Sequence, residues 1–573
     1  QRSAIGFLSS GPNDRWQPTS KTHFELRSAA AVQRSHGVFA FTDHHGVLQP
    51  EQWDSLQSYV DSVRLQLERF TAKAFTGTVS VQLYRSSEEM ALMAGAAAPG
   101  HIQQADRAVH EVVNAEYAGR ETGGLQGVIL RKLLGKPQHP ALETGLAIYH
   151  TSHWEAQGYR YWAAHLAQSD NVLSLEALLD PQRFEAESPL FTRCFSAALV
   201  EFLIAQWGHE QFLARYATWQ PDAAAIEALE PAWKAFLVQL ANTAPATHRA
   251  NATRKGLLKG FNFAHEGYRI YNGYNSRMAT ASLQRLADIG SNAIAIVPYT
   301  GQRDPAAPQD YYLAQSPGQE NDQGVIHVNY EARQRGMATM LKPQVWVRNG
   351  WPGSVAMATD QDWDRFFEAY YRWMRHYALL AEMRDMDMLC VGVEFVNATL
   401  EQPERWRQLI RQLRGIYGGA MVYAANWGKE FEQLTFWDEL DYLGINCYYP
   451  LGTDSNATVA ELRVQCENVL DGIQAVAEQH NKPVLFTEIG FRSVNHSWLK
   501  PWEEAWGQPV NLDAQHKAYQ AMIESLQDET WMAGIFWWKW PANLDYGRHN
   551  QRSFTPKEKP AEKLVENWFR NTP

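Results

Sequence analysis

Two glutamates stand at the ends of apolar runs that are typical of buried strands, Glu394 in "VGVEF" and Glu488 in "VLFTEIGFRS". Burying an unpaired carboxylate costs on the order of several kcal/mol, so each needs either a partner or a chemical role. Two carboxyl groups about 5 to 5.5 Å apart can cleave a glycosidic bond with retention, because one protonates the departing oxygen while the other attacks the anomeric carbon. The alternative for each residue taken alone is a structural ion pair with a lysine or arginine.

Eight short apolar runs follow residue 256, with amphipathic segments such as 362–383 and 459–480 between them. We predict strands at 257–263, 292–299, 337–347, 387–395, 420–426, 441–449, 483–490 and 533–540. Strands that alternate with helices predict a parallel sheet, and this number favours a (β/α)8 barrel over a doubly wound open sheet. Barrel enzymes carry their chemistry at the C-terminal ends of the strands. Glu394 ends the fourth predicted strand and Glu488 the seventh, so the two can face each other across the barrel.

The first part of the chain shows a different pattern. The polar segment 241–256, "ANTAPATHRANATRKG", has no apolar periodicity, so we place a linker there and divide the chain into domains 1–245 and 246–573. Residues 53–75 predict an amphipathic helix and residues 77–86 a strand, and most of the remainder has a helical pattern. We therefore expect the first domain to be α+β and mostly helical.

The motifs "VGVEF", "GINCYYPL", "VLFTEIGFRS" and "GIFWWKW" follow one another as in glycoside hydrolase family 113 of clan A, which the chain resembles over about residues 257–545. The resemblance implies a TIM barrel that hydrolyses β-1,4-mannosidic bonds with retention, without a cofactor. It also implies that Glu394 is the acid/base and Glu488 the nucleophile. Most of the clan has Asn immediately before the acid/base, where it contacts the sugar 2-hydroxyl, whereas this chain has Val393. Two alternatives therefore stay open: a hydrolase for another β-glycoside, such as a β-glucan or β-galactoside, and an inactive, carbohydrate-binding barrel.

The resemblance also assigns substrate-binding roles around the pair. Tyr448 matches the tyrosine that hydrogen-bonds the nucleophile in this clan, and the strand-eight tryptophan of the family falls in "FWWKW". Alternation along a strand sends Trp538 and Trp540 to one side and Trp537 to the other, so we expect Trp538 and Trp540 to form the sugar platform. The alternative for each ring is core packing. Lys342 can pair with a catalytic carboxylate. Weaker candidates for substrate contacts at other strand ends are Asn426, Trp427 and Trp346.

The first domain contains a degenerate metal motif. His110-Glu111 lies in "AVHEVVNAEYAG", which we expect to be helical, but the zinc pattern H-E-x-x-H needs a second His where this chain has Asn114. Downstream, "HPALETGLAIY" resembles the segment that supplies a Glu ligand in gluzincin-type peptidases, and Thr144 occupies the ligand position. We therefore interpret this domain as resembling a peptidase that has lost its metal site, and we expect no bound metal. We expect it to act as a helical domain that docks on the barrel and shapes its substrate cleft, and the alternative is a working zinc peptidase.

Composition restricts the partners. Lys and Arg number 52 against 63 Asp and Glu, a net charge of −11, which argues against a nucleic-acid partner. The 22 Trp residues favour a polysaccharide or oligosaccharide substrate, because flat aromatic faces can stack on sugar rings. No run approaches about 18 consecutive apolar residues, so we expect no membrane span. The chain begins at Gln1, which would fit export with removal of a leader, to a periplasmic, secreted or lipid-anchored location. The sequence does not indicate an oligomeric state.

Overall fold

The computed structural model describes residues 31–102, 108–243, 256–503, 507–527, 529–546 and 550–572. The chain divides into two compact units, residues 1–248 and residues 249–573. Most of the predicted linker at 241–256 lies outside the described residues.

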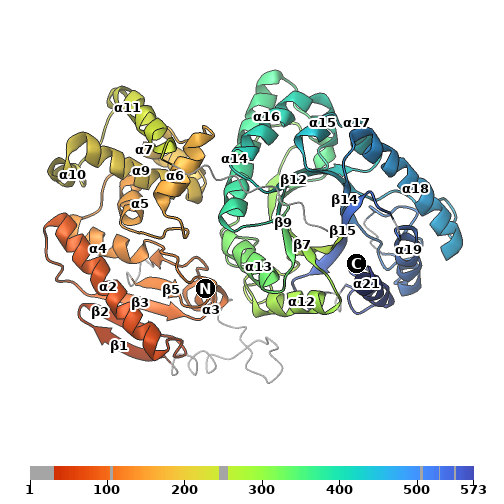
Figure 1. Ribbon diagram of the computed structural model, residues 1–573, viewed down its shortest axis with the longest axis horizontal. Helices are drawn as coiled ribbons and strands as arrows, with labels where there is room; N and C mark the ends of the chain where they lie inside the picture. Colours follow the sequence, from red (N-terminus) through yellow and green to blue (C-terminus); the bar gives the residue numbers. More distant parts are fainter. Residues whose placement is uncertain are drawn as a thin grey trace. The chain divides into compact units, whose positions relative to one another are not determined.

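The second unit is a closed barrel of parallel strands in the spatial order β11-β12-β13-β14-β15-β6-β7-β9 (Figure 1). Strand β15 pairs in parallel with β6, which closes the sheet and excludes the doubly wound alternative. The predicted (β/α)8 barrel is therefore confirmed. Its strands are β6 (Leu258–Ala264), β7 (Ala293–Ile296), β9 (Ala338–Leu341), β11 (Met388–Val393), β12 (Ala420–Asn426), β13 (Tyr442–Asn446), β14 (Val484–Ile489) and β15 (Met532–Pro541).

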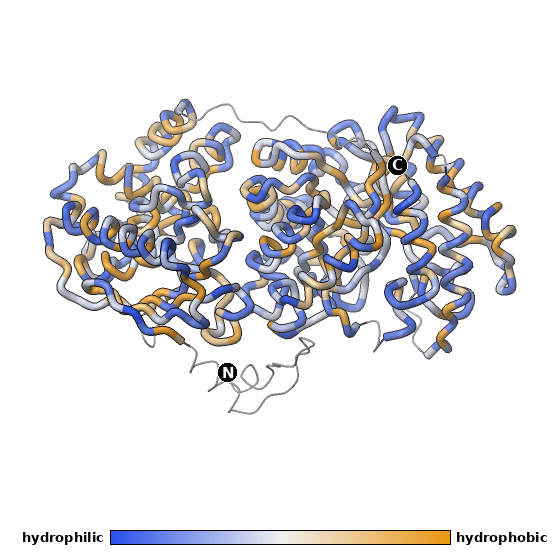
Figure 2. The backbone as a smooth tube through the Cα atoms, turned by 60° about the horizontal axis from the view of Figure 1, so that its bottom comes forward, coloured by the Kyte–Doolittle hydropathy of each residue, from blue (hydrophilic) through white to orange (hydrophobic). Residues whose placement is uncertain are grey.

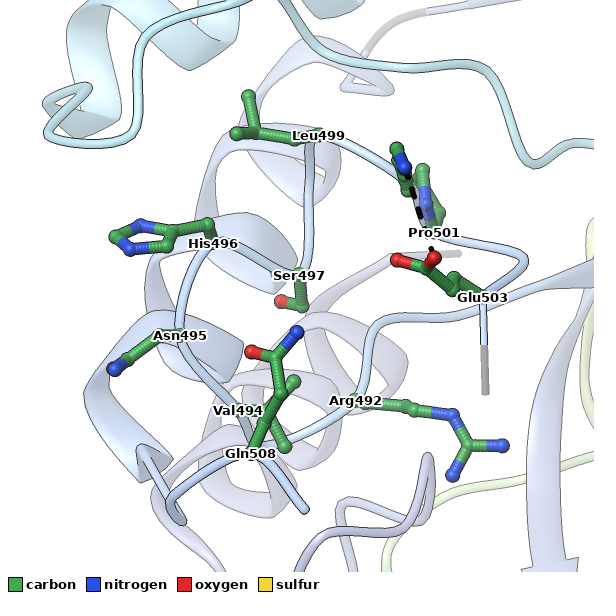
Figure 3. A pocket seen from close by; sticks show the side chains of 10 residues that line it. Arg492, Val494, Asn495, His496, Ser497, Leu499, Pro501, Glu503 and Gln508 are labelled. Carbon is green, nitrogen blue, oxygen red and sulfur yellow. Dashed lines mark ion pairs between the residues drawn. The ribbon is translucent and has the colours of Figure 1, made fainter. Parts of the chain in front are cut away.

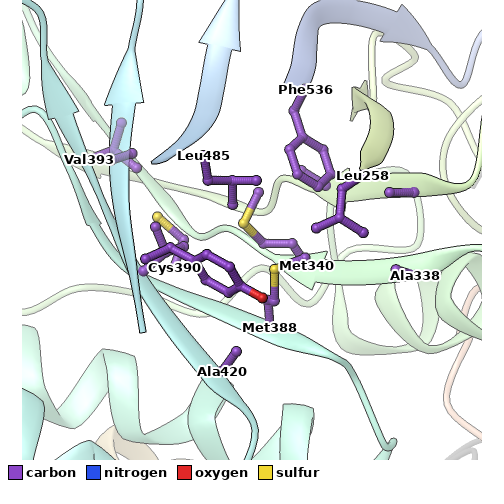
Figure 4. Close-up of a cluster of buried hydrophobic side chains, with 14 residues drawn as sticks. Leu258, Ala338, Met340, Met388, Cys390, Val393, Ala420, Leu485 and Phe536 are labelled. Carbon is purple, nitrogen blue, oxygen red and sulfur yellow. The ribbon is translucent and has the colours of Figure 1, made fainter. Parts of the chain in front are cut away.

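Apolar side chains fill the barrel. Strands β7, β9, β11, β13 and β14 are buried along their whole length, as expected for parallel strands that are covered on both faces. Figure 4 shows part of the resulting cluster, in which Met340, Met388 and Cys390 lie close to Phe536. Val393, the residue before Glu394, belongs to the same apolar cluster.

Helices surround the barrel, and several begin with side-chain caps. The Thr359 hydroxyl accepts the N–H of Asp362 at 3.1 Å at the start of α14, and Thr458 and Glu461 form a reciprocal capping box at the start of α18. In Figure 2 the chain around the barrel alternates between hydrophilic and hydrophobic colours, the pattern of helices with one face on a core. The helices of this unit are α12 (Arg277–Asp288), α13 (Asp322–Gln334), α14 (Asp360–Met383), α15 (Val396–Glu401), α16 (Pro403–Arg414), α17 (Lys429–Gln433), α18 (Val459–His480), α19 (Leu512–Ser525) and α21 (Pro560–Asn571), with 3-10 turns η1 (Pro352–Ser354) and η2 (Trp437–Glu439).

The predicted third strand, 337–347, is two strands. β9 ends at Leu341 in the barrel, and β10 (Gln344–Val347) pairs in parallel with β8 (Tyr299–Gln302) in a separate two-stranded sheet. Pro343 lies between β9 and β10. Proline has no N–H to donate, so the barrel ladder ends before it.

The first unit contains a five-stranded sheet in the order β1-β2-β3-β5-β4, with helices packed against it (Figure 1). Its strands are β1 (Val32–His36), β2 (Phe39–Asp43), β3 (Val79–Tyr84), β4 (His101–Ile102) and β5 (Val109–Val112). Its helices are α2 (Pro50–Thr71), α3 (Ser87–Ala94), α4 (Gly124–Leu134), α5 (Pro140–Tyr149), α6 (Tyr159–Gln168), α7 (Leu175–Leu179), α8 (Pro181–Ala186), α9 (Pro189–Trp207), α10 (His209–Arg215) and α11 (Ala223–Ala241). The predicted helix at 53–75 and strand at 77–86 correspond to α2 and β3.

Helix α9 is long and apolar enough to cross a membrane by length and composition alone. Inside the first unit, 67% of its apolar window is buried, and α9 packs against α5 and α6. Among the described residues this is the one helix with that composition, and its burial is that of a core helix.

The expectation that His110-Glu111 lies on a helix is wrong. Both residues belong to strand β5, which pairs in parallel with β3 and antiparallel with β4. Val109 and Val112 flank the dipeptide, and β-branched side chains favour a strand over a helix. A strand does not place residues four apart on one helical face, so the spacing on which the zinc motif depends does not exist here.

Candidate active site

Glu394 and Glu488 both lie at the C-terminal end of the barrel strands. Glu488 is the fifth residue of β14, and its side chain is 9% exposed. Glu394 follows β11 directly and has a positive φ of 55°, an uncommon backbone conformation for a residue with a side chain. Its N–H donates to the carbonyl of Ala424 on the neighbouring strand at 2.9 Å, which fixes this turn.

Three donors surround the Glu488 carboxylate. Lys342 Nζ forms an ion pair with Oε1, and Gln344 Nε2 donates to the same oxygen at 2.8 Å. The Tyr448 hydroxyl donates to Oε2 at 2.9 Å. Lys342 is fully buried and also donates to Asn262 Oδ1 at 3.1 Å. A cation and two hydrogen bonds favour the ionised form of a carboxyl group.

Glu394 has a different environment. Oε1 accepts an amide N–H from Asn446 at 2.9 Å and one from Asn426 at 3.3 Å. Burial, and then the negative charge of Glu488, raise the pKa of Glu394 to about 7, against the two amides and Lys342, which lower it. The two carboxyl groups are therefore close enough to interact electrostatically, and Glu394 retains its proton at pH values where most glutamates are ionised.

This difference between the two carboxyl groups is the arrangement needed for acid/base and nucleophilic work in one site. A carboxyl group with a raised pKa can donate a proton near neutral pH, whereas a carboxylate held by a lysine is available to attack. The residues lie on β6, β10, β12, β13 and β14, just after β11 and β13, and at the break after β9, so the fold of the barrel brings them together.

Asn446 and Asn262 were not predicted from the sequence because the side chain of each forms hydrogen bonds with residues on other strands. Asn446 ends β13, and while its Nδ2 donates to Glu394, its Oδ1 accepts the Thr487 hydroxyl at 2.9 Å. Asn262 on β6 donates to the carbonyl of Thr487 at 2.9 Å. Both amides thus hold the residue before Glu488. A polar residue near the end of a buried strand is the sequence signal that could have identified them.

A third buried carboxyl group, Glu430 on α17, was not predicted. It accepts the Thr399 hydroxyl at 2.7 Å, the Tyr423 hydroxyl at 2.8 Å and the backbone N–H of Asn426 at 2.6 Å. The Tyr423 hydroxyl in turn accepts the N–H of Phe395 at 2.7 Å. Burial raises the pKa of Glu430 to about 7.

Several aromatic candidates lie near the site. The Trp538 ring is half-buried, and Lys342 Nζ lies 5.6 Å from its centroid, which places the ring beside the partner of Glu488. Trp427 follows β12 directly, and its ring centroid lies 5.2 Å from that of Tyr449 and 5.1 Å from that of Trp502. Trp346, on β10 outside the barrel, is 62% exposed.

The expectation that Trp540 forms part of the sugar platform is wrong. Trp540 is fully buried, its Nε1 donates to Ser282 of α12 at 3.0 Å, and its ring packs edge-on against Phe261. The alternation rule fails because the pairing of β15 with β6 shifts register between Trp537 and Trp540. Trp537 is buried too, stacked on Tyr519 at 4.3 Å.

The segment that follows β14 contains a small pocket of about 210 Å³, drawn in Figure 3 with the Lys500–Glu503 ion pair. Arg492 lines it, and the guanidinium carbon lies 4.3 Å from the centroid of the Phe554 ring. This cation–π geometry gives Arg492 a packing contact with Phe554. In the part of the chain that the structure describes, no group of three or more His, Cys, Asp or Glu side chains is placed to hold a metal ion.

Comparison with known proteins bears on the second unit. A family model described as Glycoside Hydrolase Family 113 matches residues 261–559, more than half of the chain. A GH113 β-mannanase from Alicyclobacillus acidocaldarius, solved in complex with ManMIm, is 28% identical with a TM-score of 0.50, over 56% of this chain and 99% of that chain. A GH113 β-1,4-mannanase complex is 26% identical with a TM-score of 0.49, over 55% and 99%. No curated protein matches the chain. The family match lies within the second unit, so the resemblance of the first unit to a peptidase stays a prediction.

Proposed function

The chain belongs to glycoside hydrolase family 113, and on this basis we propose that it hydrolyses β-1,4-linked mannan or manno-oligosaccharides with retention of configuration. In this proposal Glu488 is the nucleophile and Glu394 the acid/base. The whole reaction uses groups of the second unit.

The proposed reaction has two displacements. In the first, Glu488 forms a bond to the anomeric carbon while the bond from that carbon to the leaving oxygen breaks, and Glu394 gives its proton to that oxygen. In the second, Glu394 removes a proton from water, the water oxygen bonds to the anomeric carbon, and the bond to Glu488 breaks. One water is consumed, one glycosidic bond is cleaved, and both carboxyl groups return to their starting states.

The observation that carries the proposal is the unequal environment of the two carboxyl groups. Lys342, Gln344 and Tyr448 donate to Glu488, whereas Glu394 meets two neutral amides and the negative charge of its partner. A structural ion pair explains Glu488 alone but leaves the raised pKa of Glu394 without a purpose. Acid/base catalysis accounts for both.

The family and the β-mannanase from Alicyclobacillus acidocaldarius support mannan as the substrate. Val393 cannot donate a hydrogen bond, and it packs in the barrel core. We propose that the amides beside Glu394, from Asn426 and Asn446, supply the polar contacts at the sugar 2-position. Trp538 is the proposed platform at the cleavage site, and Trp427, with Tyr449 and Trp502, is proposed to contact a more distant sugar.

A panel of β-mannan, β-glucan and β-galactoside substrates, with products separated by chain length, tests the substrate. We expect release of reducing ends from mannan at least about tenfold faster than from the other polymers. Proton NMR of the first-formed product tests the stereochemistry, and the β-anomer is expected. Glu488→Gln should abolish turnover while the barrel stays folded. Binding of mannan without any released reducing ends would favour the inactive, carbohydrate-binding barrel instead.

A further inference from the structure

The first unit contains a pocket of about 340 Å³ that the proposed hydrolysis does not use. Residues of helices α2 and α4, of strands β3 and β5 and of the segment after β5 line it. Its volume is at the lower end of the range for sites that hold small molecules. Much of the wall is apolar, including Val60, Val81, Leu83 and Leu125.

Glu111 lies in this wall without a cationic partner. The Thr122 hydroxyl donates to its Oε1 at 2.7 Å, and among the described residues no lysine, arginine or histidine forms an ion pair with it. Burial raises the pKa of Glu111 to about 7, and no positive charge lowers it. A carboxyl group in a largely apolar wall, with two hydrogen bonds but no cation beside it among the described residues, favours a ligand that supplies the positive charge.

Gln126 and Tyr59 add two more polar groups to the same wall. Gln126 is 1% exposed, and its Nε2 donates to the Tyr59 hydroxyl oxygen at 3.2 Å. Its Oε1 has no hydrogen-bond partner among the described residues. A fully buried amide oxygen without a partner is rare in folded proteins, and Gln126 is one of the residues that line the pocket.

A second carboxylate increases the negative charge here. Glu121 lines the pocket, held by the backbone N–H groups of Ser152 and His153. Burial, and then the charges of Glu121 and Glu111, raise the pKa of Tyr59, so both carboxyl groups lie near its hydroxyl. The charged and titratable groups that line the pocket besides Glu111 are Tyr59, Arg120, Glu121 and His153.

We propose that this pocket binds a small apolar molecule that ends in an ammonium group. The ammonium would donate to Glu111 and to the free oxygen of Gln126, and its apolar part would lie against the valine and leucine side chains. An ammonium supplies up to three N–H donors and a positive charge, which complements a wall that carries the carboxyl groups of Glu111 and Glu121. Among the lining charges, Glu111 and Glu121 disfavour a carboxylate ligand of the same shape, and Arg120 is the one described arginine in the lining that acts in the opposite direction.

Calorimetric titration of the full chain with hexylammonium, 1-hexanol and hexanoate tests the proposal. At pH 8 hexylammonium should bind about tenfold or more tightly than 1-hexanol, and hexanoate should not bind. At pH 6, binding should release about one proton, measured from the dependence of the heat on the buffer, because Glu111 must ionise to pair with the ammonium. Equal affinity for hexylammonium and hexanol, or no proton release, would overturn the proposal.

Variants locate the effect. Glu111→Gln should remove the preference for the ammonium over the alcohol, and Leu56→Trp, at a half-exposed position of the pocket wall, should weaken every alkyl ligand. Glu176→Gln is the matched control, because Glu176 is 59% exposed in a surface ion pair with Arg183. An unchanged preference in a folded Glu111→Gln protein would place the ligand elsewhere. Hydrolysis of mannan by the second unit should be the same in all three variants, which separates this test from that of the hydrolase.

Discussion

The carboxyl group of Glu430 accepts the backbone N–H of Asn426 at 2.6 Å. Through the Tyr423 hydroxyl, the same carboxyl group is linked to the N–H of Phe395, the residue after Glu394. One buried side chain therefore holds both the segment that carries Glu394 and the asparagine whose amide contacts it. Glu430 is a positioning residue, since it acts through these neighbours.

Replacing Glu430 with Gln should lower the rate without preventing folding. All three partners described for Glu430 donate hydrogen bonds to its carboxyl oxygens. In the Glu430→Gln variant one of these oxygens becomes an NH2 group, which cannot accept a hydrogen bond, so at least one of the three bonds is lost and we expect Glu394 to shift. We expect kcat on mannan to fall about tenfold or more with little change in KM, because small displacements at a reacting group are costly. Glu432→Gln, at an exposed position of the same helix, is the control and should be neutral. A rate equal to that of the control would show that Glu430 does not position the site.

The stability of the protein should also report on Glu430. Its pKa is raised to about 7, so the folded protein holds this proton in a pH range where the unfolded chain has lost it, above about pH 4.5. The stabilisation is complete below pH 4.5 and is lost as the pH rises to about 7. Relative to Glu430→Gln, the free energy of unfolding of the wild type should decrease by on the order of 3 kcal/mol across this window. Urea unfolding at several pH values measures it, and a constant difference would contradict the raised pKa.

The pH dependence of hydrolysis should follow Glu394. The first step requires its protonated form, so kcat/KM should fall as the pH rises through about 7. The rate of Glu394→Gln on mannan should be lower than that of the wild type by a factor of about 10² to 10⁴. The descending limb near pH 7 in the plot of kcat/KM against pH should disappear. For an aryl glycoside, whose leaving group needs no proton, the Glu394→Gln substitution should slow the first displacement much less. A limb that survives in the variant would assign it to another group.

Lys342 should contribute to turnover through its ion pair with Glu488. Lys342→Met removes the cation that pairs with Glu488 and leaves Gln344 and Tyr448 as its donors. We expect a loss on the order of 10² in kcat, similar to the loss of one preorganised donor. The positive charge of Lys342 also lowers the pKa of Glu394, so the limb near pH 7 should move to higher pH in the variant. A full rate with an unmoved limb would make the ion pair purely structural.

The two tryptophans of β15 should respond differently to truncation. Trp538→Ala removes a half-buried ring beside the site, so KM should rise about tenfold while the unfolding temperature changes little. Trp540→Ala removes a fully buried ring and should cost about 3 to 5 kcal/mol of stability. Kinetics and thermal unfolding of both proteins compare them. The reverse pattern would restore Trp540 as a platform.

The barrel was predictable from sequence because its signal is local and repeated. Each run of apolar residues indicates one strand, and the alternation with helices indicates the parallel sheet. The sequence predicts one strand at 337–347, whereas the structure has two, β9 and β10, on either side of Pro343. Strand β5 was missed because four residues carry too little periodicity to separate a strand from a helix.

The catalytic candidates were found because each glutamate ends an apolar run, but their partners were not. The amides of Asn446 and Asn262 reach residues on other strands, and sequence separation says nothing about such contacts. The prediction for Trp540 is wrong for a different reason. Side-chain alternation holds along a regular strand, but the pairing of β15 with β6 shifts register before Trp540, and this shift depends on the neighbouring strand.

The orientation of the Asn446 amide has a stereochemical consequence. Its oxygen is occupied by the Thr487 hydroxyl, so its NH2 must face Glu394, where Oε1 also accepts the amide of Asn426. An oxygen that already accepts two N–H groups has no room for a hydrogen of its own, which leaves Oε2 as the atom that carries the acidic proton. In the proposed reaction the departing sugar oxygen would therefore receive its proton from Oε2, and the two asparagine amides select one of the two carboxyl oxygens for proton delivery before any substrate arrives.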